Sequence, residues 1–168
     1  GVYYNIVTKA KIAEVTRNPN KYSGNIVIPE TVNYKGTECC VKTILESAFQ
    51  NCTGLISITI PNSVTSIENS AFDGCCNLTS VIIGKNVTSI GWGAFSVCSS
   101  LTSISLPNSL RSIEPYAFYA CNNIIYIDIP DNVVSIGSNV FENCYGLCSV
   151  TLPNSLTKIE DYTFGNCF

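Results

Sequence analysis

Hydrophobic and polar positions along this chain form a pattern that returns every 23 residues. The clearest copy runs from Cys52 to Gly74, where short alternations of apolar and polar residues are separated by Gly, Pro, Asn and Ser. Several columns keep the same step: cysteine at 52, 75, 98, 121, 144 and 167, leucine or isoleucine at 55, 78, 101, 124 and 147, and phenylalanine at 72, 95, 118, 141 and 164. A constant period carried by several columns predicts a stack of repeats that bury one continuous core.

Each repeat divides into three parts. The first, Ser57 to Ile60, alternates polar with apolar residues and predicts a short strand that ends at Pro61, since proline removes a ladder donor. Residues 64–67 predict a second short extended piece with its aliphatic side chains inward. Residues 69–74 are too few for a free helix, so we expect one helical or 3-10 turn that carries Ala71 and Phe72 inward.

Residues 1–45 do not follow the period. Alternating β-forming runs at 2–7 and 12–16 are separated by turn signals, and 26–29 matches the strand-and-proline segment of a repeat. Residues 33–40 form an insertion with a hairpin tip expected at Lys35-Gly36. We therefore expect a cap of short β-hairpins with a degenerate first repeat at 1–45, followed by an array of about five repeats at 46–168, because solenoid ends need covering.

Composition is consistent with one domain that buries extensive surface. The chain has 168 residues, of which 46% are hydrophobic and 12% charged. No apolar run reaches the roughly 18 residues of a membrane span. The first residues lack a basic region followed by a long apolar stretch, so no signal peptide is expected in this chain.

Charge is unevenly distributed between the two parts. Up to Asn51 there are six basic and four acidic residues, a balance of +2, and from Cys52 onward there are three basic and eight acidic residues, a balance of −5. A nucleic-acid surface needs clustered Lys and Arg to replace counterions. The repeats contain no such cluster, which argues against nucleic acid as a partner.

Cysteine usage has two interpretations. Ten cysteines suggest a disulfide framework, but six of them stand on the repeat period. We favour a ladder of small buried thiols, with rungs about 4.8 Å apart and side chains parallel rather than facing. If a disulfide forms, the off-period cysteines are the expected participants: Cys39, Cys40, Cys76 and Cys148.

The columns together resemble the BspA-type leucine-rich repeat. The matching residues are Leu55, Ile58, Ile60-Pro61, Ser63-Val64, Ile67, Ala71-Phe72 and Cys75, repeated one period apart as far as Phe168. The resemblance implies a right-handed leucine-rich-repeat solenoid of the α/β repeat class, with 23-residue coils. It also implies a secreted or surface-displayed protein of bacteria or protists that functions in adhesion. Gly84 replaces proline, and Val140 and Thr163 replace alanine.

Chemistry-bearing constellations are sparse. There is no histidine, the commonest general base and metal ligand. Glu68, Glu114 and Glu160 recur at alternate coils with glycine between, a spacing of about 10 Å that favours a solvated edge over a catalytic pair. We expect no catalysis, no cofactor and no metal site.

The outward face of the first strand column is the candidate binding surface. Its members are Ser57, Thr59, Ser80, Ile82, Ser103, Ser105, Tyr126, Asp128, Ser149 and Thr151. A merely soluble β-face is the alternative interpretation. A second candidate group, on the turn side, consists of Trp92, Tyr116, Tyr119 and Tyr162.

These observations favour a non-catalytic extracellular or cell-surface module that presents a concave parallel sheet to a protein of the host matrix or a neighbouring cell, or to a glycan. The competing hypothesis is a structural spacer or self-associating stalk. Because the sequence stops where a new repeat begins at 166–168, we also expect an open edge at the last coil and possible end-to-end pairing of two copies.

Overall fold

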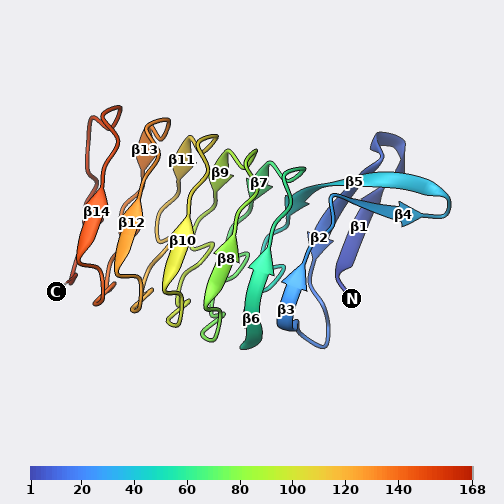
Figure 1. Ribbon diagram of the computed structural model, residues 1–168, viewed down its shortest axis with the longest axis horizontal. Coiled ribbons are helices and arrows are strands. Elements are labelled where there is room, and N and C mark those ends of the chain that lie inside the picture. The colour runs from blue at the N-terminus through green and yellow to red at the C-terminus, as the bar shows by residue number, and fades with distance from the viewer. Residues whose placement is uncertain (168) are drawn as a thin grey trace.

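The computed structural model describes residues 1–167 as a stack of coils with a row of parallel strands on one side (Figure 1). The strands of this row are β3 (Ser23–Val27), β6 (Gly54–Thr59), β8 (Ser80–Ile82), β10 (Ser103–Ser105), β12 (Tyr126–Asp128) and β14 (Ser149–Thr151). Paired residues stand 23 positions apart, as in Ser57 with Ser80 and Ser80 with Ser103. The row contains two hydrogen-bonded sheets, β10-β8-β6-β3 and β12-β14.

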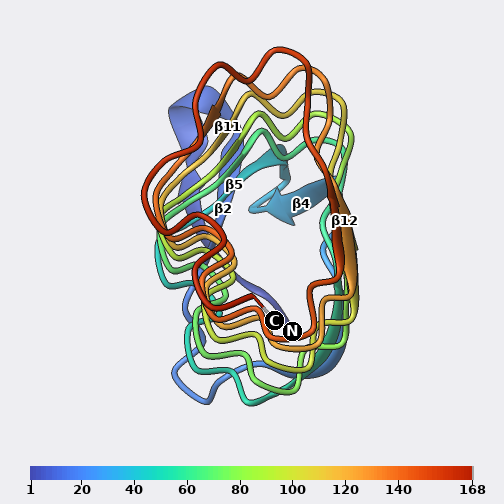
Figure 2. The ribbon, with the colours of Figure 1, turned by 90° about the vertical axis from the view of Figure 1, so that its left-hand side faces the viewer.

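A second sheet lines the opposite side of the coils, as the view along the stack shows (Figure 2). Its order is β1-β2-β5-β7-β9-β11-β13, with β4 paired to β5. In the repeats it is built from two-residue strands: β7 (Ser66–Ile67), β9 (Ser89–Ile90), β11 (Ser112–Ile113) and β13 (Ser135–Ile136). The two extended segments predicted for each repeat are thus the two sides of the coil.

Hairpins occupy the N-terminal end (Figure 1). Antiparallel β1 (Tyr3–Val7) and β2 (Ile12–Thr16) are joined by the 3-10 helix η1 (Thr8–Ala10), and β2 continues the second sheet in parallel with β5 (Thr37–Ile44). A second hairpin joins β4 (Thr31–Tyr34) to β5. Its tip is at Lys35-Gly36, as predicted, and both residues have positive φ, 50° and 80°, which suits a two-residue turn between right-twisted strands.

The fold is β-rich with almost no helix, and the single helical or 3-10 turn expected in each repeat is present only as isolated hydrogen-bonded turns. Within residues 1–167, η1 in the cap is the one helical segment. The turn from Glu68 to Cys75 does carry bonds of the 3-10 type, such as Ala71 N to Glu68 O at 3.3 Å. It ends at once because Ser70 and Gly74 are both left-handed, with φ of 51° and 72°. The Ser70 column has positive φ in every repeat from Ser47 to Tyr162, and the Gly74 column has positive φ in every repeat from Asn51 to Asn166. No helix can propagate through these left-handed residues.

In these turns, backbone amides donate hydrogen bonds to the next coil instead of continuing a helix. The Phe72 N–H donates to Ala94 O at 2.7 Å, and Phe95 N–H donates to Ala117 O at 2.8 Å. Because the turn's amides bond to the next coil, the turns stack into a third ladder. A single-sequence pattern of apolar residues does not distinguish this arrangement from a helical turn.

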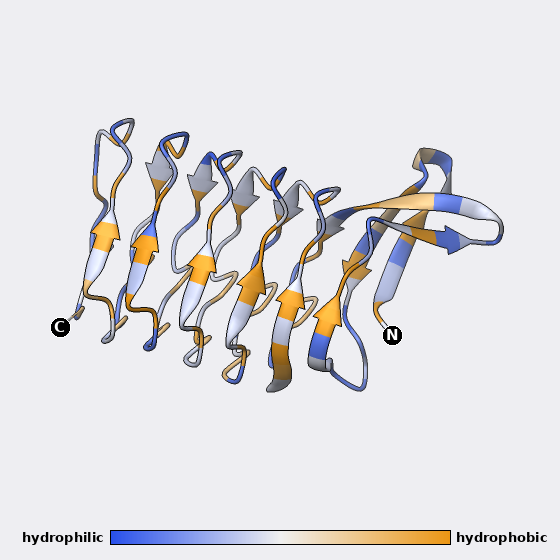
Figure 3. Ribbon diagram, viewed as in Figure 1, coloured by the Kyte–Doolittle hydropathy of each residue, from blue (hydrophilic) through white to orange (hydrophobic). Residues whose placement is uncertain are grey.

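The core is continuous along the stack. Phe49, Phe72, Phe95, Phe118 and Phe141 are fully buried, and successive rings from Phe49 to Phe164 are stacked with centroids 4.8–5.6 Å apart. Apolar segments recur at the same height on every strand of the front row (Figure 3). The predicted inward residues, including Ile58, Ile60 and Val64, are buried. The phenylalanine column therefore forms one uninterrupted stack from Phe49 to Phe164.

Candidate functional site: the outward face of the front strands

The ten predicted face residues all lie on the front row, with their side chains toward solvent. Ser57 and Thr59 on β6 are half-buried, and the eight on β8, β10, β12 and β14 are exposed. The residue between each pair is buried in β6, β8, β10 and β12, as at Ile58 and Ile127, and half-buried at Val150 in β14. Alternation along a three-residue strand therefore places one polar pair per coil on a common surface.

The face also includes two residues that the sequence analysis missed. In register with β6, Asn25 of β3 pairs with Ser57, and Val27 pairs with Thr59. Asn25 Oδ1 accepts a hydrogen bond from Ser57 Oγ at 2.8 Å, and Val27 is 72% exposed. The Ile-x-Ile-Pro ending shared by residues 26–29 and 58–61 is the signal that could have assigned them to the face.

Large exposed side chains interrupt this polar surface. Ile82 is 59% exposed and Tyr126 is 58% exposed. Asp128 lies on the same strand as Tyr126, and among residues 1–167 no ion pair involves it. An apolar group on β8 and an aromatic and an anionic group on β12 thus interrupt an otherwise serine- and threonine-rich face.

A cleft divides the face between β10 and β12. The two strands are neighbours, yet in the described part of the chain no ladder pairs them, whereas β8–β10 and β12–β14 are paired in register. The cleft has a volume of about 250 Å³ and is lined by Ser103, Ser105, Asn108, Tyr126 and Asp128, with Ile104, Leu106 and Pro130. Ile104 and Leu106 form the apolar part of the lining and are 8% and 7% exposed.

The turn-side aromatic group is partly packed. Trp92 and Tyr116 rings lie 5.5 Å apart at 51°, and Tyr116 and Tyr119 rings lie 5.8 Å apart. Asn143 Nδ2 donates to Tyr119 Oη at 2.9 Å. Trp92 stays half exposed and Tyr162 is 70% exposed. Because Trp92, Tyr116 and Tyr119 pack on one another and Tyr119 also accepts a hydrogen bond from Asn143, this group is the weaker candidate.

The periodic cysteines are structural. Each thiol from Cys75 to Cys167 donates to the carbonyl of the phenylalanine 26 residues earlier, for example Cys98 Sγ to Phe72 O at 3.2 Å and Cys121 Sγ to Phe95 O at 3.1 Å. All cysteines lie within residues 1–167 and are free thiols. Burial raises the pKa of Cys75 and Cys144 to about 12, and the pKa values of Cys98 and Cys121 well above their usual value. Because the thiolate is the nucleophile and the metal ligand, this column is chemically inert.

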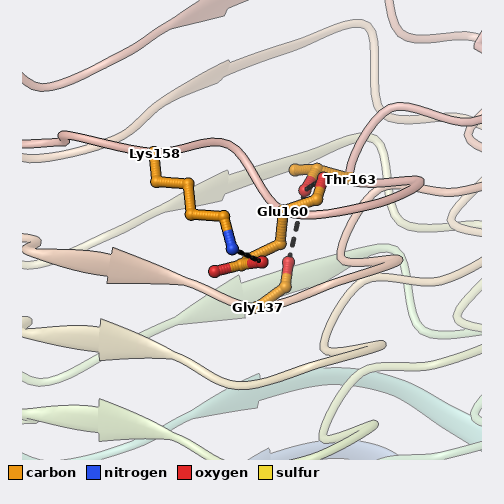
Figure 4. Close-up of polar contacts among 4 residues, drawn as sticks. All are labelled: Gly137, Lys158, Glu160 and Thr163. Carbon is orange, nitrogen blue, oxygen red and sulfur yellow. Dashed lines mark hydrogen bonds and ion pairs between the residues drawn. The ribbon is translucent and has the colours of Figure 1, made fainter.

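The glutamate column lies at a coil edge, where Glu68 Oε2 accepts a hydrogen bond from the Glu46 N–H at 3.0 Å. Glu160 pairs with Lys158 of its own coil, Nζ to Oε2 at 2.6 Å, as Figure 4 shows. Both side chains are exposed, so the pair contributes little to stability. In the same view, the buried Thr163 hydroxyl donates to Glu160 O at 2.7 Å and lies 3.4 Å from Gly137 O. The hydroxyl group that Thr163 adds at this alanine position is thus hydrogen-bonded to backbone carbonyls.

Residues 1–167 contain no group of three or more metal-ligating side chains and no helix long and apolar enough to cross a membrane.

A family model described as the BspA type leucine-rich repeat region matches residues 42–168 in six copies. The chain belongs to the BspA-type leucine-rich repeat family. No curated protein matches it.

Solved structures of bacterial leucine-rich repeat proteins resemble this BspA-type chain over nearly its full length. A leucine-rich repeat protein from Bacteroides ovatus is 33% identical with a TM-score of 0.89, covering 99% of this chain and 43% of its own. The T. pallidum leucine-rich repeat protein is 30% identical with a TM-score of 0.90, covering 99% and 75%. A leucine-rich cell surface protein from Faecalibacterium prausnitzii is 32% identical with a TM-score of 0.86, covering 98% and 46%. The chain therefore spans less than half of two of these relatives.

Proposed function

We propose that this BspA-type repeat protein is a non-catalytic binding module, secreted or displayed at the cell surface, that recognises a protein partner through the outward face of β3, β6, β8, β10, β12 and β14. The observation that carries the proposal is the composition of this face. Exposed Val27, Ile82 and Tyr126 alternate with hydroxyl groups and one carboxylate along the front row of strands, and repeat arrays use such extended surfaces for binding.

Three further features belong to this proposal. We expect the array to wind as a right-handed solenoid of 23-residue coils with the front face concave, and residues 1–45 to act as its cap ahead of the array at 46–168. The surface location is supported by the likeness to the leucine-rich cell surface protein of Faecalibacterium prausnitzii. The absence of catalysis is supported by the lack of histidine and by the raised pKa values of the buried thiols.

The partner class expected first is a protein of the host matrix or of a neighbouring cell. An anionic array, with a balance of −5 from Cys52 onward, favours partners with a neutral or basic surface. The competing function, a spacer or self-associating stalk, would use the ends of the stack rather than its face. Mutations on the front face should therefore weaken a binding module, whereas mutations at the ends of the stack should weaken a spacer or stalk.

The experiment is capture of extracellular-matrix and serum proteins on the immobilised chain, compared with a Tyr126→Ala/Asp128→Ala double variant. A Val134→Ala/Ser135→Ala variant is the matched control, because Val134 is 59% exposed and lies beside the second sheet. We expect a protein that is captured by the wild type and the control and lost from the face variant, at unchanged melting temperature. Equal capture by all three, or capture of nothing, would contradict the proposal and favour the spacer.

A further inference from the structure

We propose that the cleft between β10 and β12 binds a single neutral pyranose, one sugar residue of a glycan. This inference rests on the proposed function, because it names a ligand class for the same face. The occupant is chosen by the chemistry of the cleft walls and by the size of the cleft.

The cleft provides hydrogen-bonding groups that the rest of the sheet uses up. Where β8 pairs with β10 and β12 with β14, the ladder consumes the backbone N–H and C=O groups between strands. Between β10 and β12 no such ladder forms in the described residues, so the facing edges leave main-chain groups for a polar occupant. A ligand with several hydroxyl groups meets that requirement, since each hydroxyl both donates and accepts.

Side chains around the cleft suit the same ligand. Ser103 and Ser105 supply hydroxyl groups from one wall, and Asp128 supplies a carboxylate acceptor from the other. Hydrogen bonds to an ionised acceptor are stronger than those between neutral groups. The Tyr126 ring, 58% exposed at the same rim, offers an apolar face to the C–H side of a sugar ring.

Size limits the occupant to one ring. A volume of about 250 Å³ lies just below the roughly 300–1,000 Å³ of pockets for drug-sized ligands. A divalent cation is disfavoured because the one carboxylate among the lining residues falls short of the six to eight oxygen ligands that Ca²⁺ takes. The carboxylate and the acidic array also disfavour an anionic sugar.

An exposed aromatic ring and a carboxylate occur together on one strand of the front row, β12. At the positions of Tyr126 and Asp128, the next coil has Ser149 and Thr151, and the coil before the cleft has Ser103 and Ser105. Neither pair carries an aromatic ring or a carboxylate. The aromatic ring and the carboxylate of β12 are therefore the two groups whose removal tests the site.

The test is saturation-transfer difference NMR of the full chain with the methyl glycosides of glucose, galactose, mannose and N-acetylglucosamine at millimolar concentration, and N-acetylneuraminic acid as the anionic comparator. We expect at least one neutral glycoside to bind and the anionic sugar to give no signal. Tyr126→Ala and Asp128→Ala should each weaken binding about tenfold or more, because each removes a contact to the sugar ring. Asp128→Asn should fall between Asp128→Ala and the wild type.

The Val134→Ala/Ser135→Ala variant, beside the second sheet and off the front face, should leave sugar binding unchanged. Absence of transfer to every neutral glycoside, or binding that survives both Tyr126→Ala and Asp128→Ala, would overturn the inference. Loss of sugar binding in this control as well would place the site elsewhere and overturn it too. If a protein is captured through the face while the glycosides fail, only this inference fails; if the glycosides bind and no protein is captured, the protein-partner proposal fails.

Discussion

The Cys98 thiol donates a hydrogen bond to the backbone carbonyl of Phe72 in the preceding coil, Sγ to O at 3.2 Å. The same carbonyl accepts the Cys75 N–H at 3.1 Å, so each thiol adds a second donor to a buried acceptor. This bond explains why the column contains cysteine rather than alanine or valine. The side chain must be small, apolar enough for burial and able to donate.

Replacing Cys98 by alanine should lower the free energy of unfolding by about 2 kcal/mol, since it removes both buried volume and the bond to Phe72 O. Cys98→Ser should lose less, because the hydroxyl keeps the donor. Urea denaturation measures both, with Cys148→Ala at an exposed position as the neutral control. If Cys98→Ser were the more damaging of the two, the thiol would be acting as a filler and the hydrogen bond would not matter.

Stability should fall as pH rises above about 9. Burial holds the pKa of Cys75 and Cys144 at about 12 in the folded state, while the same thiols titrate near 9.0 when unfolded. The unfolded state therefore binds fewer protons above pH 9. The contribution of each thiol is fully present below pH 9, and it is lost at up to about 1.4 kcal/mol per pH unit between 9 and 12. Urea midpoints from pH 7 to 10 measure this, and a Cys75→Ala/Cys144→Ala variant should show a shallower decline; parallel profiles would count against the assignment.

Thiol reagents should distinguish the exposed cysteine from the column. Cys148 is exposed, whereas Cys98 and Cys121 are fully buried with raised pKa values. We expect a maleimide to label Cys148 rapidly in the folded protein and the two buried thiols after denaturation. Mass spectrometry of peptides locates each label. Rapid labelling of Cys98 in the native state would show that the coils open at that point.

Truncation of the phenylalanine column should be the most damaging single change. Phe118 is fully buried and stacks on Phe95 and Phe141 at 5.5 and 5.6 Å. Phe118→Ala should cost about 3–5 kcal/mol of unfolding free energy. Calorimetry or chemical denaturation measures it against Tyr162→Ala, whose side chain is 70% exposed. A wild-type melting temperature for Phe118→Ala would rule out the column as the main source of stability.

Gly91 should not tolerate a side chain, although its column carries glutamate in alternate coils. A Cβ at Gly91 would lie 2.7 Å from the Glu68 carbonyl carbon, closer than packed atoms allow. Gly91→Ala should therefore destabilise the fold by about 1–3 kcal/mol. Glu114→Ala, in the same column, should be nearly neutral. Equal melting temperatures for both variants would show that the backbone relaxes without penalty.

The period and the inward columns could be predicted from sequence because stacking forces equivalent residues into equivalent environments. Phe72 and Cys75 each repeat one coil later, as Phe95 and Cys98, with the same burial. The turn at residues 68–75 could not be predicted, since its conformation depends on left-handed Ser70 and Gly74 and on bonds to the neighbouring coil. Val97 and Tyr116 adopt positive φ as well, which residue type alone would not suggest.

The outward face of the front strands could be predicted in composition but not in shape. Alternation around Ile127 placed Tyr126 and Asp128 outside. The interrupted pairing of β10 with β12 depends on how two particular coils meet, and the residues on either side follow the same period as every other coil. A pattern shared by all repeats contains no information about where the ladder breaks.

Hydroxyl-radical footprinting of the chain, with and without its captured protein, tests most directly whether the front face contacts the partner. Ile82, Tyr126 and Val134 are matched probes, exposed by 59%, 58% and 59%, with the first two on the front row and the third beside the second sheet. We expect the partner to reduce labelling of Ile82 and Tyr126 and to leave Val134 unchanged. Protection of Val134 with undiminished labelling of Ile82 and Tyr126 would contradict the claim.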